Sequence, residues 1–256
     1  MSAGTTAAGA FAENRFKDRR RAWRRRIWWA FPLVAGFEIA VGLGFTFAFH
    51  PPHAAFYVGF TFGVTVGMLL ALADSPPHHI ERWRSGAEGE KATAKALKKL
   101  PSGWQVVHDI DIGRGNVDHV VVGPPGVFAL DTKSLSGVVS VKAGVLSVRY
   151  REDPDDGYEL PGLAWRMGWL ARTIETRLQG DGVAPVTVQP VVVIWAPFAQ
   201  RSILSGRVAW VSGKQIAKVL AQRPATLTPE QVAQIAAGLR RPWRPVAPHA
   251  ERVTPV

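Results

Sequence analysis

Three charged side chains, Asp118, Asp131 and Lys133, fall within two short apolar segments at residues 117–122 and 127–133. Apolar runs rich in β-branched residues and bounded by glycine and proline are typical of β-strands. Side chains at positions i and i+2 of a strand project from the same side, so Asp131 and Lys133 are predicted to share one face of a sheet. What the three groups do together then depends on how the two strands pair.

The pairing follows from the connection between the strands, which reads Gly-Pro-Pro-Gly. If these four residues form the loop, Val122 pairs with Val127, and Asp118 lies directly opposite Asp131. The β-carbons of such a pair are about 4.5–5.5 Å apart, and two like charges there are destabilising unless a positive group lies between them. The register therefore predicts two carboxylates and the amine of Lys133 on one side of a hairpin.

This combination of groups suits metal-dependent phosphodiester hydrolysis. Carboxylate oxygens, together with water and phosphate, are the ligands of hard cations such as Mg²⁺ or Mn²⁺. A bound metal polarises a phosphoryl oxygen and lowers the pKa of the attacking water, and a lysine orients that water or neutralises charge on the phosphate. The alternative is that Asp118 and Asp131 are ordinary solvated acids near strand ends. Facing carboxylates on so apolar a hairpin argue for a site.

The elements that must position these residues indicate an α/β fold, a mixed central sheet flanked by helices. Helix capping boxes are expected at Ser212 with Gln215 and at Thr228 with Gln231. Besides the hairpin, the pattern predicts helices at 86–100, 163–178, after Ser212 and from Thr228 to Leu239, and strands at 104–112, 138–141, 145–150, 187–195 and 208–211.

Two apolar runs precede this domain, at residues 27–49 and 54–73. Each is long enough to cross a hydrocarbon core of about 30 Å as a helix. The first contains one charge, Glu38, which is expected to face the partner helix or to be neutral; a functional intramembrane carboxylate is the alternative. A cleaved signal peptide is the alternative for the first run, but the run is too long and a second span follows at once.

The flanking charges predict the orientation of this helical hairpin. Arg82 and Arg84 follow the second span, and Trp28 and Trp29 suit an interfacial aromatic belt. The positive-inside rule then puts both chain ends in the cytoplasm of a multi-pass protein of the cell (inner) membrane. Eight basic residues precede the first span: Arg15, Lys17, Arg19, Arg20, Arg21, Arg24, Arg25 and Arg26.

Glycine recurs every fourth residue in the second span, at Gly59, Gly63 and Gly67. Such spacing permits close helix packing. We expect these glycines to pack the two spans of one chain together; the alternative is a homo-oligomer formed through them.

The composition excludes some kinds of site and favours some kinds of binding partner. The chain of 256 residues has no cysteine, which excludes disulfides and thiolate metal sites. Its net charge of +11 favours polyanionic partners such as nucleic acid or anionic lipid.

The motifs together resemble a known family, the nuclease-related domain (NERD), which is grouped with the PD-(D/E)xK restriction-endonuclease-like fold. The resemblance spans about residues 84–200 and is strongest over 86–137. It is carried by Gly-Ala-Glu-Gly-Glu at 86–90, Asn-Val-Asp-His-Val-Val-Val at 116–122, the Gly-Pro-Pro-Gly turn, and Val-Phe-Ala-Leu-Asp-Thr-Lys at 127–133. It implies a role in DNA processing, with Mg²⁺ as the expected cofactor.

The resemblance also implies roles for individual residues. Glu90 matches the helix acid of the family, Asp118 the second-motif aspartate, and Asp131 with Lys133 the (D/E)xK pair; Asp118, Asp131 and Glu90 are then the metal ligands. Glu88 is the alternative helix acid, and since the two glutamates point about 200° apart on a helix, at most one can face the site.

Further residues are weaker candidates. In fold relatives the helix after the hairpin offers a Gln or a basic side chain to the site, and Arg166 stands in that region as a candidate phosphate contact. Arg114 lies in a glycine-flanked loop; a contact with a nucleic-acid backbone is one interpretation, and a solvated loop charge is the favoured alternative. Asn116 is expected across from Lys133, and His119 is expected to point to the opposite sheet face in a structural role.

The sequence thus divides into a basic segment 1–26, spans at 27–49 and 54–73, a nuclease-like domain 84–239 and a disordered tail 240–256. Three functions are consistent with it: a membrane-anchored nuclease acting on DNA, a nucleic-acid-binding module without turnover, and a membrane scaffold.

Overall fold

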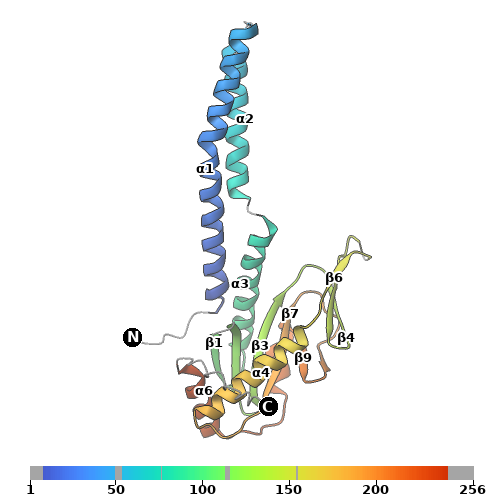
Figure 1. Cartoon of the computed structure of the whole chain (residues 1–256). Helices are drawn as coiled ribbons and strands as arrows, with labels where there is room; N and C mark the ends of the chain where they lie inside the picture. Colours follow the sequence, from blue (N-terminus) through green and yellow to red (C-terminus); the bar gives the residue numbers. More distant parts are fainter. Residues whose placement is uncertain (1–7, 50–53, 76, 113–115, 154, 242–256) are drawn as a thin grey trace, which may run out of the picture. The chain divides into compact units, whose positions relative to one another are not determined.

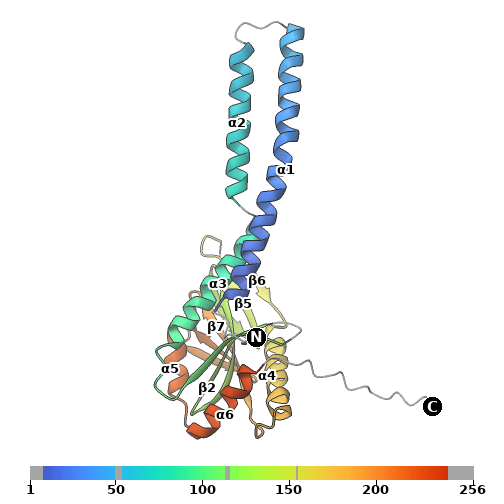
Figure 2. The same cartoon turned by 90° about the vertical axis from the view of Figure 1, so that its left-hand side faces the viewer.

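The computed structural model describes residues 8–49, 54–75, 77–112, 116–153 and 155–241. The chain forms two compact units, one helical, Ala12–Ser85, and one that contains the sheets and comprises the rest of the described residues. Figures 1 and 2 show the helices and strands of both units. The disordered tail predicted at 240–256 lies, beyond its first two residues, outside the described residues.

The helical unit contains the two predicted spans as helices α1 (Ala10–Phe49) and α2 (Ala54–Asp74). Both are long and apolar enough to cross a membrane. Helix α1 begins at Ala10 rather than at Ile27, so the basic segment is largely helical. Arginine, lysine and alanine have high helix propensities, and they extend the apolar helix towards the N-terminus.

Polar and steric contacts join the two long helices, and they correct one prediction. The Thr65 hydroxyl donates to a Glu38 carboxylate oxygen, so Glu38 faces the partner helix as expected. The close approach is at Gly42, where an added β-carbon would lie 3.0 Å from Val58. The expectation that Gly59, Gly63 and Gly67 pack the spans together is wrong, because β-carbons built there meet nothing within 4 Å.

The main sheet of the second unit is mixed, as predicted, with strand order β1-β2-β3-β7-β9-β8. The β3–β7 and β7–β9 pairs are parallel, and the other pairs are antiparallel. Parallel strands need a crossover connection, which the helices supply. The bounds are β1 Gln105–Asp111, β2 Asn116–Gly123, β3 Gly126–Ser134, β7 Val188–Trp195, β8 Ser202–Ser205 and β9 Val208–Ser212.

Helices cover both faces of this sheet (Figure 2). Helices α4 (Leu163–Gly180) and α6 (Pro229–Arg240) pack on the face formed by residues such as Val120 and Ala129. The C-terminal part of α3 (His78–Leu97) and α5 (Ile216–Ala221) pack on the face formed by residues such as Val121 and Leu130. The central strand β7 is buried on both sides, which explains its continuous apolar sequence.

A smaller antiparallel sheet contains β4 (Val138–Lys142), β5 (Val145–Arg149) and β6 (Gly157–Leu160). Strands β6 and β8 were not predicted; each has four residues and little apolar alternation, so pairing with a neighbour rather than propensity makes them strands.

The two predicted capping boxes had different outcomes. The one at Thr228 and Gln231 is present before α6. The one at Ser212 is wrong: a short 3₁₀ turn, η1 (Gly213–Gln215), precedes α5 there, and the Ser212 side chain makes no capping hydrogen bond.

Candidate functional site: an acidic cluster at the end of the β2–β3 hairpin

The predicted register of the β2–β3 hairpin is confirmed. Val122 pairs with Val127, and the pairing continues to His119 and Leu130. The turn is one pair tighter than expected, because Gly123 also pairs with Gly126. Alternation along the two strands therefore places Asp118 and Asp131 on the face covered by α4.

Asp118 follows the last regular pair of the hairpin, and its side chain bonds to the neighbouring strand. The backbone N–H of Thr132 donates to Asp118 Oδ2 at 2.6 Å. Burial, and then the charges of Asp131 and Glu90, hold the pKa of Asp118 well above its ordinary value. The carboxylate is thus held in place by one hydrogen bond while its charge is opposed by two other acids.

Asp131 lies between two cations. Lys133 Nζ is 2.5 Å from Oδ2, and a guanidinium nitrogen of Arg166 is 2.7 Å from Oδ1. The aspartate is 8% exposed, whereas the Arg166 side chain is about half exposed. The structure therefore brings Lys133 to the predicted carboxylate, and it places Arg166 of α4 on the same group.

Glu90 reaches the cluster from α3. An added β-carbon on Gly89 would lie 2.9 Å from the Ser134 β-carbon, so glycine allows α3 to approach β3 closely. Glu90 Oε2 is buried and has no hydrogen-bond partner in the described part of the chain. Burial, then Asp109 and Asp131, raises the pKa of Glu90 to about 7, against the opposing effect of Lys133. Glu88 is exposed.

Asp109 is an acid of this cluster that the sequence analysis missed. It interrupts the β1–β2 pairing between the pairs His108–His119 and Ile110–Val117, which puts it opposite Asp118. Its φ of 51° is unusual for a residue other than glycine. If the four residues 112–115 are taken as the connection between these strands, the register argument used for the β2–β3 hairpin places Asp109 opposite Asp118 and reveals this second facing pair of acids.

Asp109 is held by neutral donors. The Asn116 side chain donates to Oδ1 at 2.9 Å, and the backbone N–H of Ala10 donates to Oδ2 at 3.1 Å. Asn116 pairs with Asp111 of β1. The regular β2–β3 pairing stops at His119 and Leu130, so the structure records no pair between Asn116 and Lys133. Arg114 lies outside the described residues.

His119 is fully buried, with Nδ1 2.8 Å from Nδ1 of His108. Burial, and then the neighbouring His108, lowers the pKa of His119 to about 3. A neutral imidazole in this place is part of the packing behind the cluster.

A buried chain of polar groups fixes α3 to the sheet beside the acids. The indole N–H of Trp195 donates to the Thr93 hydroxyl at 2.7 Å, and Thr93 Oγ1 lies 3.0 Å from Thr132 Oγ1. Thr93 is one helical turn from Glu90, and Thr132 lies next to Asp131. This chain therefore sets the position of the helix acid relative to the strand acids.

The cluster fits a hard cation by residue type and charge, although its ligands are not gathered around one point. Among the residues that the structure describes, no three carboxylate or imidazole groups are close enough to hold a metal ion. Burial, and then neighbouring acids, nevertheless raise the pKa values of Glu90 and Asp118 against the opposing effect of Lys133, and Glu90 Oε2 has no hydrogen-bond donor among the described residues. Asp131 already has two cationic partners.

The second unit is thus a mixed α/β domain with acids, a lysine and an arginine at one end of a central hairpin, which is consistent with a nuclease-like α/β fold. The model of the nuclease-related domain family matches residues 85–195. These residues run from α3 to the end of β7 and include the whole acidic cluster. Over these residues the chain is similar to the nuclease-related domain, the family that its motifs resemble.

An uncharacterized protein of Bacillus anthracis is 29% identical to this chain over 80 residues, which are 29% of this chain and 37% of that protein. The chain thus spans little more than a third of the length of this relative. No solved structure matches the chain.

Proposed function

We propose that this protein is a membrane-anchored, metal-dependent nuclease that hydrolyses phosphodiester bonds of DNA. The observation that carries the proposal is the incomplete neutralisation of the acidic cluster. Burial and neighbouring acids raise the pKa values of both Glu90 and Asp118, and Glu90 has a buried oxygen without a hydrogen-bond donor in the described chain. Perturbed acids of this kind are typical of functional sites.

Asp118, Asp131 and Glu90 are the proposed ligands of Mg²⁺ or Mn²⁺. Such a cation would polarise a phosphoryl oxygen and make a bound water more acidic. Asp131 offers Oδ1 and Oδ2 to Arg166 and Lys133 in the structure, so ligation requires one of these cations to move to another partner.

The two cations beside Asp131 are suited to the phosphate of a substrate. Lys133 is mostly buried and lies within hydrogen-bonding distance of Asp131, so its ammonium is held where it orients a water or stabilises charge on phosphate. Arg166 is about half exposed, and its planar guanidinium matches two phosphate oxygens. We propose that Arg166 exchanges Asp131 for the phosphate backbone when DNA binds, and that Arg114 contributes from its loop.

Membrane anchoring is proposed from α1 and α2, whose length and apolar composition suit two spans. Arginines precede the first span, and Arg82 and Arg84 follow the second. This arrangement supports a multi-pass protein of the cell (inner) membrane with both chain ends in the cytoplasm. The nuclease-related domain then acts on DNA on the cytoplasmic side.

The test is DNA cleavage by the full chain in detergent, with Mg²⁺, with Mn²⁺ and with a chelator. Linear and circular substrates are both needed. We expect cleavage only with the metals, and its loss in Asp131→Asn. Glu88→Gln is the matched control, because Glu88 is an exposed acid on α3 close to Glu90. Cleavage that persists in the chelator, or that both variants lose equally, contradicts the proposal.

A second function, nucleic-acid binding without turnover, is favoured by one observation. Each carboxylate oxygen of Asp131 has a cationic side chain of the protein within 2.7 Å, so a metal is not needed to balance the charge of this one acid. A binding protein predicts steeply salt-dependent association with DNA that Asp131→Asn leaves intact.

A scaffold function would use the open face of α2 at Gly59, Gly63 and Gly67 for self-association. This alternative predicts oligomers of the full chain that bulky substitutions at these glycines disrupt.

A further inference from the structure

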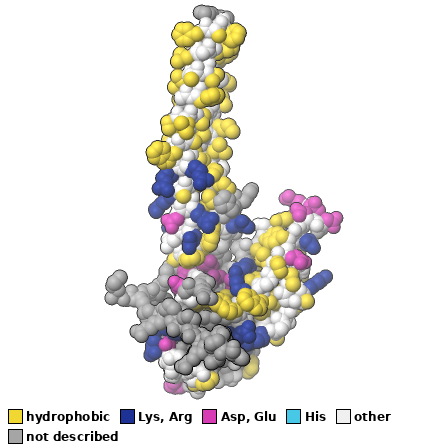
Figure 3. All heavy atoms as spheres, viewed as in Figure 1, with side chains coloured by type: hydrophobic (Ala, Val, Ile, Leu, Met, Phe, Trp, Pro, Cys, Tyr) yellow, Lys and Arg dark blue, Asp and Glu magenta, His cyan; other side chains and the backbone are white. Residues whose placement is uncertain are grey.

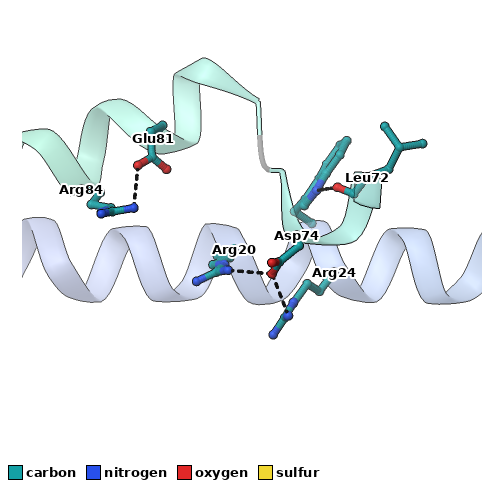
Figure 4. A network of polar contacts seen from close by, with 7 residues as sticks. Arg20, Arg24, Leu72, Asp74, Glu81 and Arg84 are labelled. Atoms are coloured by element: carbon teal, nitrogen blue, oxygen red, sulfur yellow. Dashed lines mark hydrogen bonds and ion pairs between the residues drawn. The ribbon is translucent and has the colours of Figure 1, made fainter. Parts of the chain in front are cut away.

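The basic segment of α1 has two faces with different surroundings. Arg20 and Arg24 both contact Asp74 at the end of α2, at 3.1 and 3.2 Å (Figure 4). Beside them the indole N–H of Trp23 donates to the Leu72 carbonyl at 3.1 Å. Trp23 and Arg24 follow Arg20 by three and four positions, so both lie on the same side of the helix as Arg20. This clamp face, Arg20, Trp23 and Arg24, holds the end of α2.

The neighbouring face carries cations that nothing in the described chain neutralises. Arg21 and Arg25 are exposed and make no ion pair or hydrogen bond with any described residue. Arg26 is exposed and likewise without such a partner. Asp18 is the one acid between residues 14 and 26. The arginines therefore keep their full charge towards whatever surrounds the helix.

The position of Arg21, Arg25 and Arg26 along α1 indicates that they lie beside the headgroup region of a membrane. Trp28 and Trp29 follow within one turn and are 58% and 74% exposed. Beyond them the helix continues as the apolar span without interruption. Figure 3 shows this order on the surface, with Lys and Arg side chains gathered at one end of the apolar part of the helix pair. Tryptophan prefers the level of the lipid headgroups, which fixes the arginines just outside it.

We propose that Arg21 and Arg25, with Arg26 and Trp28 beside them, bind the headgroups of anionic phospholipids. The proposal rests on the membrane anchoring described above. Anionic lipids have the complementary charge, and arginine binds phosphate through a planar fork of donors. Nucleic acid is also a polyanion, but the continuity of this face with the tryptophans and the span favours lipid. A role in topology alone would require the charge of the segment, not the accessibility of one face.

The two faces supply matched variants that each remove two positive charges. Arg21→Gln/Arg25→Gln alters the lipid face, and Arg20→Gln/Arg24→Gln alters the clamp face. The full chain is reconstituted in phosphatidylcholine vesicles with spin-labelled phosphatidylglycerol or spin-labelled phosphatidylcholine as probe. The fraction of each probe whose motion the protein restricts gives the selectivity.

We expect the wild type to prefer the anionic probe several-fold, since each basic group near an anionic surface strengthens binding by up to about fivefold. The preference should fall with salt, disappear in Arg21→Gln/Arg25→Gln and remain in Arg20→Gln/Arg24→Gln. Equal losses in both variants, or no loss in either, overturn the proposal, because the charge would then act without regard to face.

Further outcomes distinguish failure of the lipid site from failure of membrane anchoring, and lipid binding from nucleic-acid binding. If alkaline carbonate extracts the wild type from vesicles, membrane anchoring fails and the lipid site fails with it. If the protein stays integrated but shows no preference, only the lipid site is overturned. If Arg21→Gln/Arg25→Gln weakens DNA binding and leaves lipid selectivity unchanged, the face binds nucleic acid instead.

Discussion

The two units neutralise charge in opposite ways. On the helix pair, Asp74 shares its exposed carboxylate between the partly exposed Arg20 and the exposed Arg24. In the sheet unit, four acids converge at the end of one hairpin, and burial raises the pKa values of Glu90 and Asp118. Exposed pairs contribute little to stability, whereas a buried acid without a counter-charge is costly. The comparison indicates that the Asp74 ion pairs serve to position the helices, and it supports the proposal that the acidic cluster has a role in chemistry.

The largest expected effect is at Lys133. Replacing it with methionine keeps much of the side-chain volume and removes the ammonium beside Asp131. We expect metal-dependent cleavage to fall by about a hundredfold or more, because a positioned cation is lost where charge develops on phosphate. Rates measured under single-turnover conditions check this, with Mn²⁺ binding measured in parallel. A rate within a few-fold of the wild type contradicts a role for the lysine in the reaction.

Glu90→Gln should stabilise the metal-free protein at pH 8. The folded pKa of about 7 lies above the ordinary value of 4.5, so wild-type stability falls as pH rises between these values. Glutamine does not ionise, so the variant keeps the stability that the wild type loses. Its gain in free energy of unfolding over the wild type should be on the order of 2 kcal/mol at pH 8 and smaller towards pH 5. Thermal unfolding at both pH values, with a chelator present, tests the prediction.

The control for this experiment is Glu88→Gln, which removes the same charge from an exposed position. It should change stability little at either pH. A gain for Glu90→Gln that is equally large at pH 5 would show that packing, and not relief of repulsion, is responsible.

Thr93→Val should destabilise the sheet unit by about 1–2 kcal/mol, because the indole N–H of Trp195 loses its acceptor in a buried place. The same variant is expected to weaken Mn²⁺ binding, since Thr93 helps to fix the position of Glu90. Thermal unfolding and metal titration check the two effects together. Loss of stability with unchanged metal affinity would separate the polar chain from the site.

The smallest effect is expected at the clamp of the helix pair. Asp74→Asn removes the partner of Arg20 and Arg24, and such surface pairs contribute at most about 1 kcal/mol. We expect a small fall in the thermal stability of the full chain in detergent and no change in DNA cleavage. A fall as large as that of Thr93→Val would mean that exposed charges on the helix pair matter as much as buried groups in the sheet.

The sequence predicts best where one strong local rule acts. The glycine–proline turn determined the hairpin register, and this gave the facing positions of Asp118 and Asp131 and the nearness of Lys133. Long apolar runs likewise identified α1 and α2. The nearness of Asp131 to Arg166 depends on the packing of α4 on the sheet, which no local pattern specifies.

The features that the sequence analysis missed or predicted wrongly also depend on tertiary contacts. Asp109 joins the cluster through a backbone of positive φ in β1, and Gly59, Gly63 and Gly67 lie away from α1 because the rotation of α2 is set by contacts such as Thr65 with Glu38. Strands β6 and β8 exist because neighbours pair with them. In each case a tertiary contact decided what spacing alone left open.

The central claim is that the acidic cluster holds a divalent cation, and Mn²⁺ binding followed by electron paramagnetic resonance tests it most directly. The account predicts that the full chain binds Mn²⁺, that Asp118→Asn abolishes this binding, and that Glu88→Gln leaves it intact. Mn²⁺ binding that survives Asp118→Asn unchanged, or no binding by the wild type at millimolar Mn²⁺, would contradict the account.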